Sequence, residues 1–191
     1  MILFVSEVHK ATDIFTAIDR PGNSLQRSFL RRSEMKAVYN RQSDVSVLRA
    51  VRKNGFAIMQ IKEQTEAICM EAVKQNGLAL QYVRKQTEAI CLETVKRDGY
   101  MVQFVHEQTE AISLEAVRQN GYALMWVEKQ TEAICLEAVK QNGLSLQHVR
   151  KQTEAICLEA VKQNQEAAEY IKDAAMFVYV CEKLGIEYLV E

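Results

Sequence analysis

The sequence predicts an all-α protein, an α-solenoid of stacked helix-turn-helix repeats with a helical cap at each end. The first observation is a stretch, QTEAICMEAVKQNGLALQYVRK at 64–85, that returns almost letter for letter from Gln86, Gln108 and Gln130, a period of 22 residues. Glycine and threonine keep the same period, at Gly55, Gly77, Gly99, Gly121 and Gly143 and at Thr65, Thr87, Thr109, Thr131 and Thr153. Self-similarity at a fixed period of roughly 20 to 50 residues is typical of solenoids and repeat arrays.

The period divides the chain into three parts. Residues 42–173 make six tandem repeats, and the first and the last are degenerate: Ser43 stands where the others have threonine, and Gln165 stands where glycine is expected. End units of a solenoid differ from inner ones because one of their sides faces water. We therefore expect residues 1–41 to form an N-terminal helical cap and residues 174–191 to form a C-terminal helical cap.

The N-terminal segment contains two candidate helices, separated by Pro21 and Gly22. The second helix is basic, and its cations could form a patch for an anion or a nucleic acid: Arg27, Arg31, Arg32 and Lys36. Aromatic residues do not alternate with these cations, as they do in a groove for single-stranded nucleic acid. A solvated outer face of the cap is therefore the favoured interpretation.

Each repeat reads as two helices. Thr65 can cap the N-terminus of helix A, which we expect over residues 65–76. Gly77 follows, and a glycine in the left-handed conformation commonly ends a helix. A shorter helix B is expected over residues 78–85, and a helix of fewer than ~12 residues needs its neighbours to hold it. Small alanines would let neighbouring helices A approach closely, at positions 72, 116, 138 and 160.

The C-terminal end departs from this pattern. The sixth repeat lacks the glycine, so we expect its helix to continue through residues 165–173. A final apolar helix, AAMFVYVCEKLG, is expected to end at Gly185.

Composition and spacing argue against a membrane protein and a metal site. No apolar run approaches the ~20 residues of a membrane-spanning helix. The repeated cysteines lack the short spacing of zinc ligands, and helices stacked ~8 to 10 Å apart would keep them too far apart for disulfides. We therefore expect the cysteines to be small core residues of a cytoplasmic protein.

No catalytic constellation or cofactor is expected. The glutamates at 71, 93, 115, 137 and 159 form the only array of carboxylates, and each has Lys or Arg three residues later. Acid-base catalysis needs two carboxylates in unlike environments, whereas a repeat gives them like environments. These glutamates are interpreted as ion pairs on helix A.

The repeat resembles a known family. TEAICMEAVKQNGLALQYV at 65–83 is similar to uncharacterised short helical-repeat domains of bacteriophages, giant DNA viruses and some bacteria, whose core is a Cys-Leu-Glu-Ala-Val-Lys-Gln-Asn-Gly string followed by a Tyr-Val pair. The resemblance covers residues 42–173. It implies a phage or viral origin, or a bacterium that carries a prophage, and a role in host takeover or against host defence. It implies no catalytic residues.

Two functions remain open, a protein-binding solenoid and a nucleic-acid-binding repeat protein. Residues 1–85 carry a net charge of +6 (14 basic, 8 acidic), and residues 86–191 carry −7 (10 basic, 17 acidic). A nucleic-acid groove should be basic along its whole length, so the change of sign favours a protein partner. The same charge split would allow head-to-tail docking of two copies, for which a polar monomer is the alternative.

Variation among the repeats locates the predicted working surface. Helix A barely changes from copy to copy, whereas helix B varies in two columns, one of them mostly aromatic. Aromatic residues are enriched at interface hot spots. The candidates from both columns are Tyr82, Phe104, Trp126, His148, Arg84, His106, Glu128 and Arg150. The aromatic residues either face a protein ligand or wedge between adjacent repeats.

Overall fold

The computed structural model describes residues 45–187, and the described residues from Val47 onward belong to one compact unit. The N-terminal cap expected over 1–41, with its basic residues Arg27, Arg31, Arg32 and Lys36, lies outside the described residues, as do residues 188–191. Every regular element in the described range is a helix, and no strand occurs there. The predicted all-α solenoid is confirmed.

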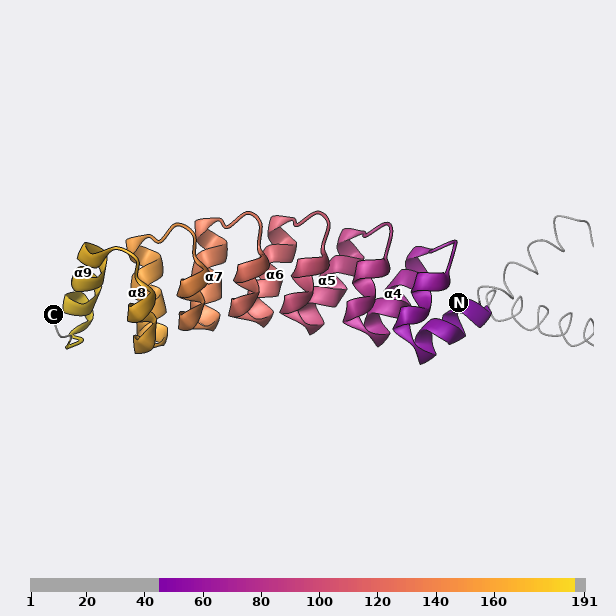
Figure 1. Cartoon of the computed structure of the whole chain (residues 1–191), viewed down its shortest axis with the longest axis horizontal. Helices are drawn as coiled ribbons and strands as arrows, with labels where there is room; N and C mark the ends of the chain where they lie inside the picture. The colour runs from indigo at the N-terminus through magenta and orange to yellow at the C-terminus, as the bar shows by residue number, and fades with distance from the viewer. Residues whose placement is uncertain (1–44, 188–191) are drawn as a thin grey trace, which may run out of the picture. The chain divides into compact units, whose positions relative to one another are not determined.

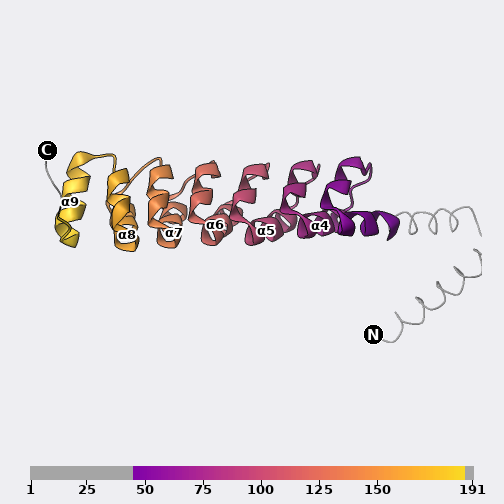
Figure 2. The ribbon, with the colours of Figure 1, turned by 60° about the horizontal axis from the view of Figure 1, so that its bottom comes forward.

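Each repeat contains an α-helix followed by a 3-10 helix, labelled η. Residues 47–53 are helical in the first repeat. The later α-helices are α4 (Glu66–Gln75), α5 (Glu88–Arg97), α6 (Glu110–Gln119), α7 (Glu132–Gln141), α8 (Glu154–Gln163) and, at the C-terminal end, α9 (Ala174–Leu184). The 3-10 helices are η1 (Gly55–Gln60), η2 (Gly77–Tyr82), η3 (Gly99–Phe104), η4 (Gly121–Trp126), η5 (Gly143–His148) and η6 (Gln165–Tyr170). Each α-helix packs against the next one, in the order of the sequence (Figure 1). The 3-10 helices also pack against one another, and we call them the η row (Figure 2).

Capping residues fix where each α-helix begins and ends. Thr65 precedes α4, and its hydroxyl oxygen accepts a hydrogen bond from the Ile68 N–H at 3.4 Å. Asn76 leaves the helical region with φ −150° and ψ 115°, and its side chain accepts from the Leu78 N–H at 3.0 Å. One asparagine thus ends the α-helix and caps the 3-10 helix. The bounds predicted for helix A are confirmed.

Helix B differs from the prediction in type and extent. It is the six-residue 3-10 helix η2, and Arg84 and Lys85 lie in the loop that follows it. The Val83 N–H donates to the Leu80 carbonyl at 3.0 Å, three residues back. Bonds of this kind suit a helix that is too short for several α-helical turns.

The repeat glycines do not adopt the predicted left-handed conformation. Among the described residues only Gly185 has a positive φ, of 66°. Glycine is needed for space instead: a Cβ on Gly143 would lie 2.4 Å from the Ala160 carbonyl oxygen of the next repeat. Three other repeat glycines make the same approach to an alanine carbonyl, with distances of 2.6, 2.4 and 2.5 Å at Gly55, Gly99 and Gly121.

The expected continuation of the last repeat helix is also wrong. α8 ends at Gln163, and η6 follows it without a glycine, because Asn164 caps η6 as the other asparagines do. The exposed Gln165 has room for its side chain. The final helix α9 ends at Gly185, as predicted, and there the left-handed conformation does occur.

The buried apolar side chains between the α-helices and the η row form two clusters, one from Val51 to Ala123 and one from Val117 to Cys181. Each of α4 to α8 buries the same four positions, which in α4 are Ile68, Cys69, Ala72 and Val73. Full burial of an isoleucine side chain contributes ~2 to 3 kcal/mol. The cysteines of the described chain are buried and unpaired: Cys69, Cys91, Cys135, Cys157 and Cys181. They are small core residues, as the sequence predicts.

Candidate interaction surface

A column of glutamines holds the η row together. The Gln64 side-chain N–H groups donate to the Ile58 carbonyl at 3.1 Å and to the Tyr82 carbonyl at 3.0 Å. Its side-chain oxygen accepts from the Arg84 N–H at 2.9 Å. One side chain thereby satisfies backbone groups that two short helices leave open. We call this arrangement the glutamine staple, and it recurs at Gln86, Gln108, Gln130 and Gln152.

The predicted aromatic column lies at the ends of the 3-10 helices. Tyr82 and His148 are half-buried, and each packs edge-on against a ring of the preceding repeat. The ring centroids are 6.0 Å apart for Phe56 and Tyr82 and 5.7 Å apart for Tyr122 and His148. Burial also lowers the pKa of His148. These two rings wedge between repeats, while keeping part of their surface open.

Two further members of that column differ from each other in exposure. Phe104 is half-buried, whereas Trp126 is 43 % exposed beside Met125, which is 44 % exposed. Both exposed side chains belong to η4. Trp126 is therefore the most accessible of the predicted aromatic candidates.

The second predicted column lies in the loops after the 3-10 helices. The Arg84 guanidinium donates to the Lys62 and Ile61 carbonyls of the preceding repeat at 2.6 and 3.2 Å. Arg150 makes the equivalent bonds to the preceding loop at 2.6 and 3.1 Å. His106 and Glu128 are exposed, and only their backbone N–H groups enter staples. These residues lie one to a repeat, so the structure does not bring them into a single cluster.

Exposed apolar side chains concentrate on the η row. Of the large hydrophobic residues that are exposed in the described chain, none lies on α4 to α8, and five lie on 3-10 helices: Met59, Leu78, Met125, Trp126 and Tyr170. The helices η1 to η5 also contain no Asp, Glu, Lys or Arg, although such residues make up 26 % of the chain. The aromatic column was predicted from the sequence, whereas this absence of charge was missed, although the sequence alone could have shown it.

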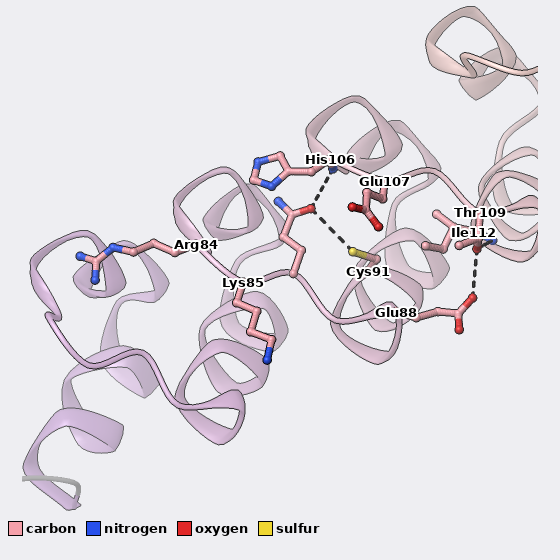
Figure 3. A pocket seen from close by; sticks show the side chains of 9 residues that line it. Arg84, Lys85, Glu88, Cys91, His106, Glu107, Thr109 and Ile112 are labelled. Atoms are coloured by element: carbon pink, nitrogen blue, oxygen red, sulfur yellow. Dashed lines mark hydrogen bonds between the residues drawn. The ribbon is translucent and has the colours of Figure 1, made fainter.

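A hollow of about 280 Å³ lies at the loop edge beside α5 (Figure 3). Its lining comprises Arg84, Lys85, Gln86, Glu88, Cys91, His106, Glu107, Thr109 and Ile112. Burial raises the pKa of the Cys91 thiol to about 11, so the thiol stays protonated at neutral pH and is a poor nucleophile. Arg84 is turned away from His106 and Glu107, toward the preceding repeat (Figure 3). No group of three or more metal-ligating side chains occurs among the residues described.

Ion pairs on the α-helices join successive repeats instead of lying within one helix. Arg52 Nε lies 2.9 Å from a carboxylate oxygen of Glu71, and Arg118 makes the same contact with Glu137. The predicted partners three residues later in the same helix are wrong. An exposed pair of this kind contributes ~0 to 1 kcal/mol.

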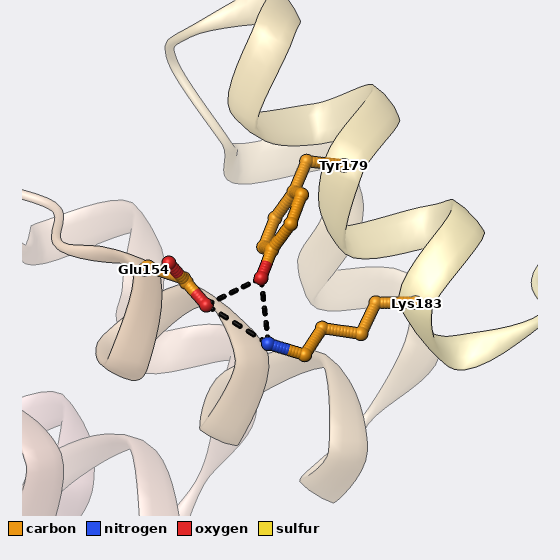
Figure 4. Close-up of polar contacts among 3 residues, drawn as sticks. All are labelled: Glu154, Tyr179 and Lys183. Atoms are coloured by element: carbon orange, nitrogen blue, oxygen red, sulfur yellow. Dashed lines mark hydrogen bonds and ion pairs between the residues drawn. The ribbon is translucent and has the colours of Figure 1, made fainter.

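A three-residue cluster attaches α9 to α8 (Figure 4). Tyr179 and Lys183 donate to one carboxylate oxygen of Glu154 at 2.6 and 2.9 Å. These hydrogen bonds, first from Tyr179 and then from Lys183, lower the pKa of the Glu154 carboxyl. Earlier in the chain, the glutamate equivalent to Glu154 is bound by a threonine hydroxyl from the following repeat. Thr87, for example, donates to Glu66 at 2.9 Å.

The described chain contains no helix that is both long and apolar enough to cross a lipid bilayer.

Comparison with known proteins gives one match. The family model described as a domain of unknown function, DUF4116, matches four overlapping segments in tandem: residues 47–87, 66–110, 109–152 and 131–174. Neither the curated proteins nor the solved structures gave a match.

Proposed function

The chain belongs to the DUF4116 family, a domain of unknown function, and we propose that its repeats form a non-catalytic protein-protein interaction module whose binding face is the η row. One observation carries this proposal. Exposed large hydrophobic residues lie on the 3-10 helices and are absent from α4 to α8. Within the repeats from α4 to η6, a solenoid that buries the same positions in every α-helix has no packing reason to expose apolar side chains on its 3-10 helices and not on α4 to α8. Partner binding supplies that reason.

Met125 and Trp126 form the centre of the proposed face. They are adjacent in η4 and 44 % and 43 % exposed. Trp is among the residues that most often dominate interface energetics. Nucleic-acid binding, the alternative, needs Lys and Arg against phosphates, and η1 to η5 contain neither.

Three finer points extend the proposed function. The family resemblance extends it to a phage or viral protein that inhibits or redirects a host defence protein. Unpaired buried cysteines support a reducing compartment such as the cytoplasm. Head-to-tail docking of two copies rests on the opposite net charges of the two halves of the chain, and light scattering at low and high salt tests it.

Affinity capture with a matched pair of variants tests the proposed face. A double variant, Met125→Ala with Trp126→Ala, should lose partner proteins that the unaltered chain captures from nuclease-treated extract of its own cell. Lys140→Ala, at an exposed position on α7, should retain them. Equal capture by all three chains at unchanged melting temperatures would contradict the proposal, and capture that nuclease abolishes would favour nucleic acid.

A further inference from the structure

Two kinds of contact join successive repeats in addition to the glutamine staples. In the first, the N–H of a repeat glycine donates to a glutamine side chain of the next repeat, as Gly121 does to Gln141 at 2.6 Å. In the second, a basic side chain reaches from the loop after one 3-10 helix to carbonyls of the preceding loop. Arg150 does so toward Glu128 and Val127 at 2.6 and 3.1 Å. We call this second contact the loop bridge.

The two contacts are unevenly distributed over the five junctions between repeats. The loop bridge comes from Arg84 at the first junction, from Arg150 at the fourth and from Lys172 at the fifth. The bond from glycine is present at these three junctions and at the third. Within the described residues, only the second junction, between the second and third repeats, lacks both contacts.

Two residues account for this difference. His106 stands at the loop-bridge position, and in the described chain its imidazole makes no hydrogen bond to the preceding loop; only its backbone N–H is bonded, to the Gln86 staple. Arg97 stands where the other repeats have glutamine, and a guanidinium has no acceptor for the Gly77 N–H. Arg97 donates to the Lys74 carbonyl instead.

Fewer bonds and more space therefore meet at the second junction. The hollow of about 280 Å³ is lined by residues of both the loop after η2 and the loop after η3 (Figure 3). Besides the Arg97 bond, the junction keeps the Gln86 staple and a hydrogen bond from Thr87 to Glu66 at 2.9 Å. Proteins open locally where the fewest stabilising contacts have to be given up.

We infer that the second junction is a hinge, at which residues 47–85 and residues 86–187 change their relative orientation as two stiffer segments. The Gln86 staple is the pivot, because it bonds carbonyls of both η2 and η3. A change of angle between η2 and η3 alters the curvature of the η row, and curvature shapes the binding surface of a solenoid. The inference rests on the contacts at the five junctions and does not require the proposed function.

The repeated cysteines can report on the hinge. Cys91 lies beside the Gln86 staple, with its Sγ 3.8 Å from the glutamine side-chain oxygen, and it lines the hollow. Cys69 holds the same repeat position after the Gln64 staple of the first junction, which has both contacts. The two side chains are 3 % and 2 % exposed, so both thiols need an opening of the structure in order to react.

Labelling of the full chain with iodoacetamide, followed by mass spectrometry of tryptic peptides, measures the rate at each thiol. We expect Cys91 to react about tenfold faster than Cys69. Cys91 should also react faster than Cys135 and Cys157, which share the tryptic sequence QTEAICLEAVK and are measured together as a second control. Dilute urea should widen the difference, because the open form exposes more surface.

Exchange of the two loop residues provides matched variants. His106→Arg supplies the missing loop bridge and should slow the labelling of Cys91 several-fold, whereas Arg84→His removes a loop bridge and should accelerate the labelling of Cys69. Thr94→Ala combined with Arg97→Gln supplies the missing acceptor for the glycine N–H and should also slow the labelling of Cys91.

Three outcomes would overturn the inference. Equal rates for Cys91 and Cys69, in a chain with its normal melting temperature, would show that the second junction does not open preferentially. A fast rate at Cys91 that urea leaves unchanged would show direct access through the hollow. A rate at Cys91 that neither His106→Arg nor the double variant lowers would show that the missing contacts do not control the opening.

Discussion

The junction between the second and third repeats differs from the four other junctions between repeats. At those four, the glycine N–H donates to a glutamine of the next repeat at 2.5 to 2.7 Å. At Gly77 this bond is missing, because Arg97 occupies the glutamine position and has no acceptor in its side chain. Arg97 instead donates to the Lys74 carbonyl. At the four regular junctions the glycine also lies against an alanine carbonyl of the next repeat. We call the glycine-to-glutamine hydrogen bond together with this close approach the glycine clasp.

Larger side chains accompany the missing clasp. Thr94 stands where other repeats have alanine, and it is fully buried with its hydroxyl donating to the Ile90 carbonyl at 2.7 Å. Met101 replaces a smaller residue in η3 and is 6 % exposed. A Cβ on Gly77 would meet only the Met101 side chain within 3.4 Å, not a carbonyl. The fold therefore tolerates a junction that lacks the glycine clasp. At this junction the Gln86 staple still joins the 3-10 helices of the second and third repeats.

The largest expected effect separates the two kinds of junction directly. Gly143→Ala places a methyl group 2.4 Å from the Ala160 carbonyl oxygen, and it should destabilise the chain by ~1 to 3 kcal/mol. Gly77→Ala meets a flexible methionine and should change stability by less than ~1 kcal/mol. Urea unfolding of both variants measures the difference. Equal losses would show that the second junction is as tight as the others.

A second comparison concerns the staples. Gln86→Leu leaves the Leu80 and Phe104 carbonyls and the His106 N–H without their partner, a loss of ~1 to 3 kcal/mol. Gln130→Leu removes the same bonds at a junction that keeps its clasp. We expect the first substitution to lower the melting temperature more. Equal losses would mean that the two ties act independently, and a larger loss for Gln130→Leu would contradict the expectation.

Restoring the clasp sharpens the comparison further. Thr94→Ala combined with Arg97→Gln gives the second junction the alanine and the glutamine of the others, while Met101 stays, and should add ~1 kcal/mol of stability. In that background Gly77→Ala should become as costly as Gly143→Ala. A double-mutant cycle measures this coupling. If Gly77→Ala stays harmless, Met101 alone keeps the junction open.

The smallest expected effect distinguishes the C-terminal junction, where an ionisable cluster replaces a threonine. Hydrogen bonds from Tyr179 and Lys183 depress the pKa of Glu154, so the folded state binds a proton there less readily than the unfolded chain. Stability from this group is present above the ordinary Glu pKa of ~4.3 and is lost as pH falls through the lowered pKa. Hydrogen exchange should show α9 loosening in acid before α5 to α7, and Glu154→Gln should abolish that pH dependence.

Local signals in the sequence predicted much of the fold. Thr65 and Asn76 fix the ends of α4 through their own side chains, and residues of these types indicate helix ends in a sequence. Glycine was harder to interpret, because left-handed backbone and close approach both require it. The structure identifies the second reason, because an alanine carbonyl of the next repeat leaves no room for a Cβ at Gly143 or at three other repeat glycines. The 3-10 geometry of helix B also depends on packing more than on propensity.

The candidate surface was less predictable than the fold. Variation pointed to Trp126, which is exposed, but it equally pointed to Arg84, whose guanidinium ties two loops together. Variation marks positions that are free to change, and such freedom does not tell an exposed ring from a side chain that bridges repeats. The staple at Gln64 could not be predicted from the sequence, because its hydrogen-bond partners lie in two different repeats.

The staple makes the length of this array adjustable. Each staple glutamine bonds its own repeat and the one before it, so any two whole repeats placed in succession can form the contact. A chain lacking residues 108–129 would bring Gly99 against Ala138 and Gln141, replacing Ala116 and Gln119 with identical residue types. Duplication or loss of 22-residue blocks in the gene can therefore lengthen or shorten the η row without any new contact having to evolve.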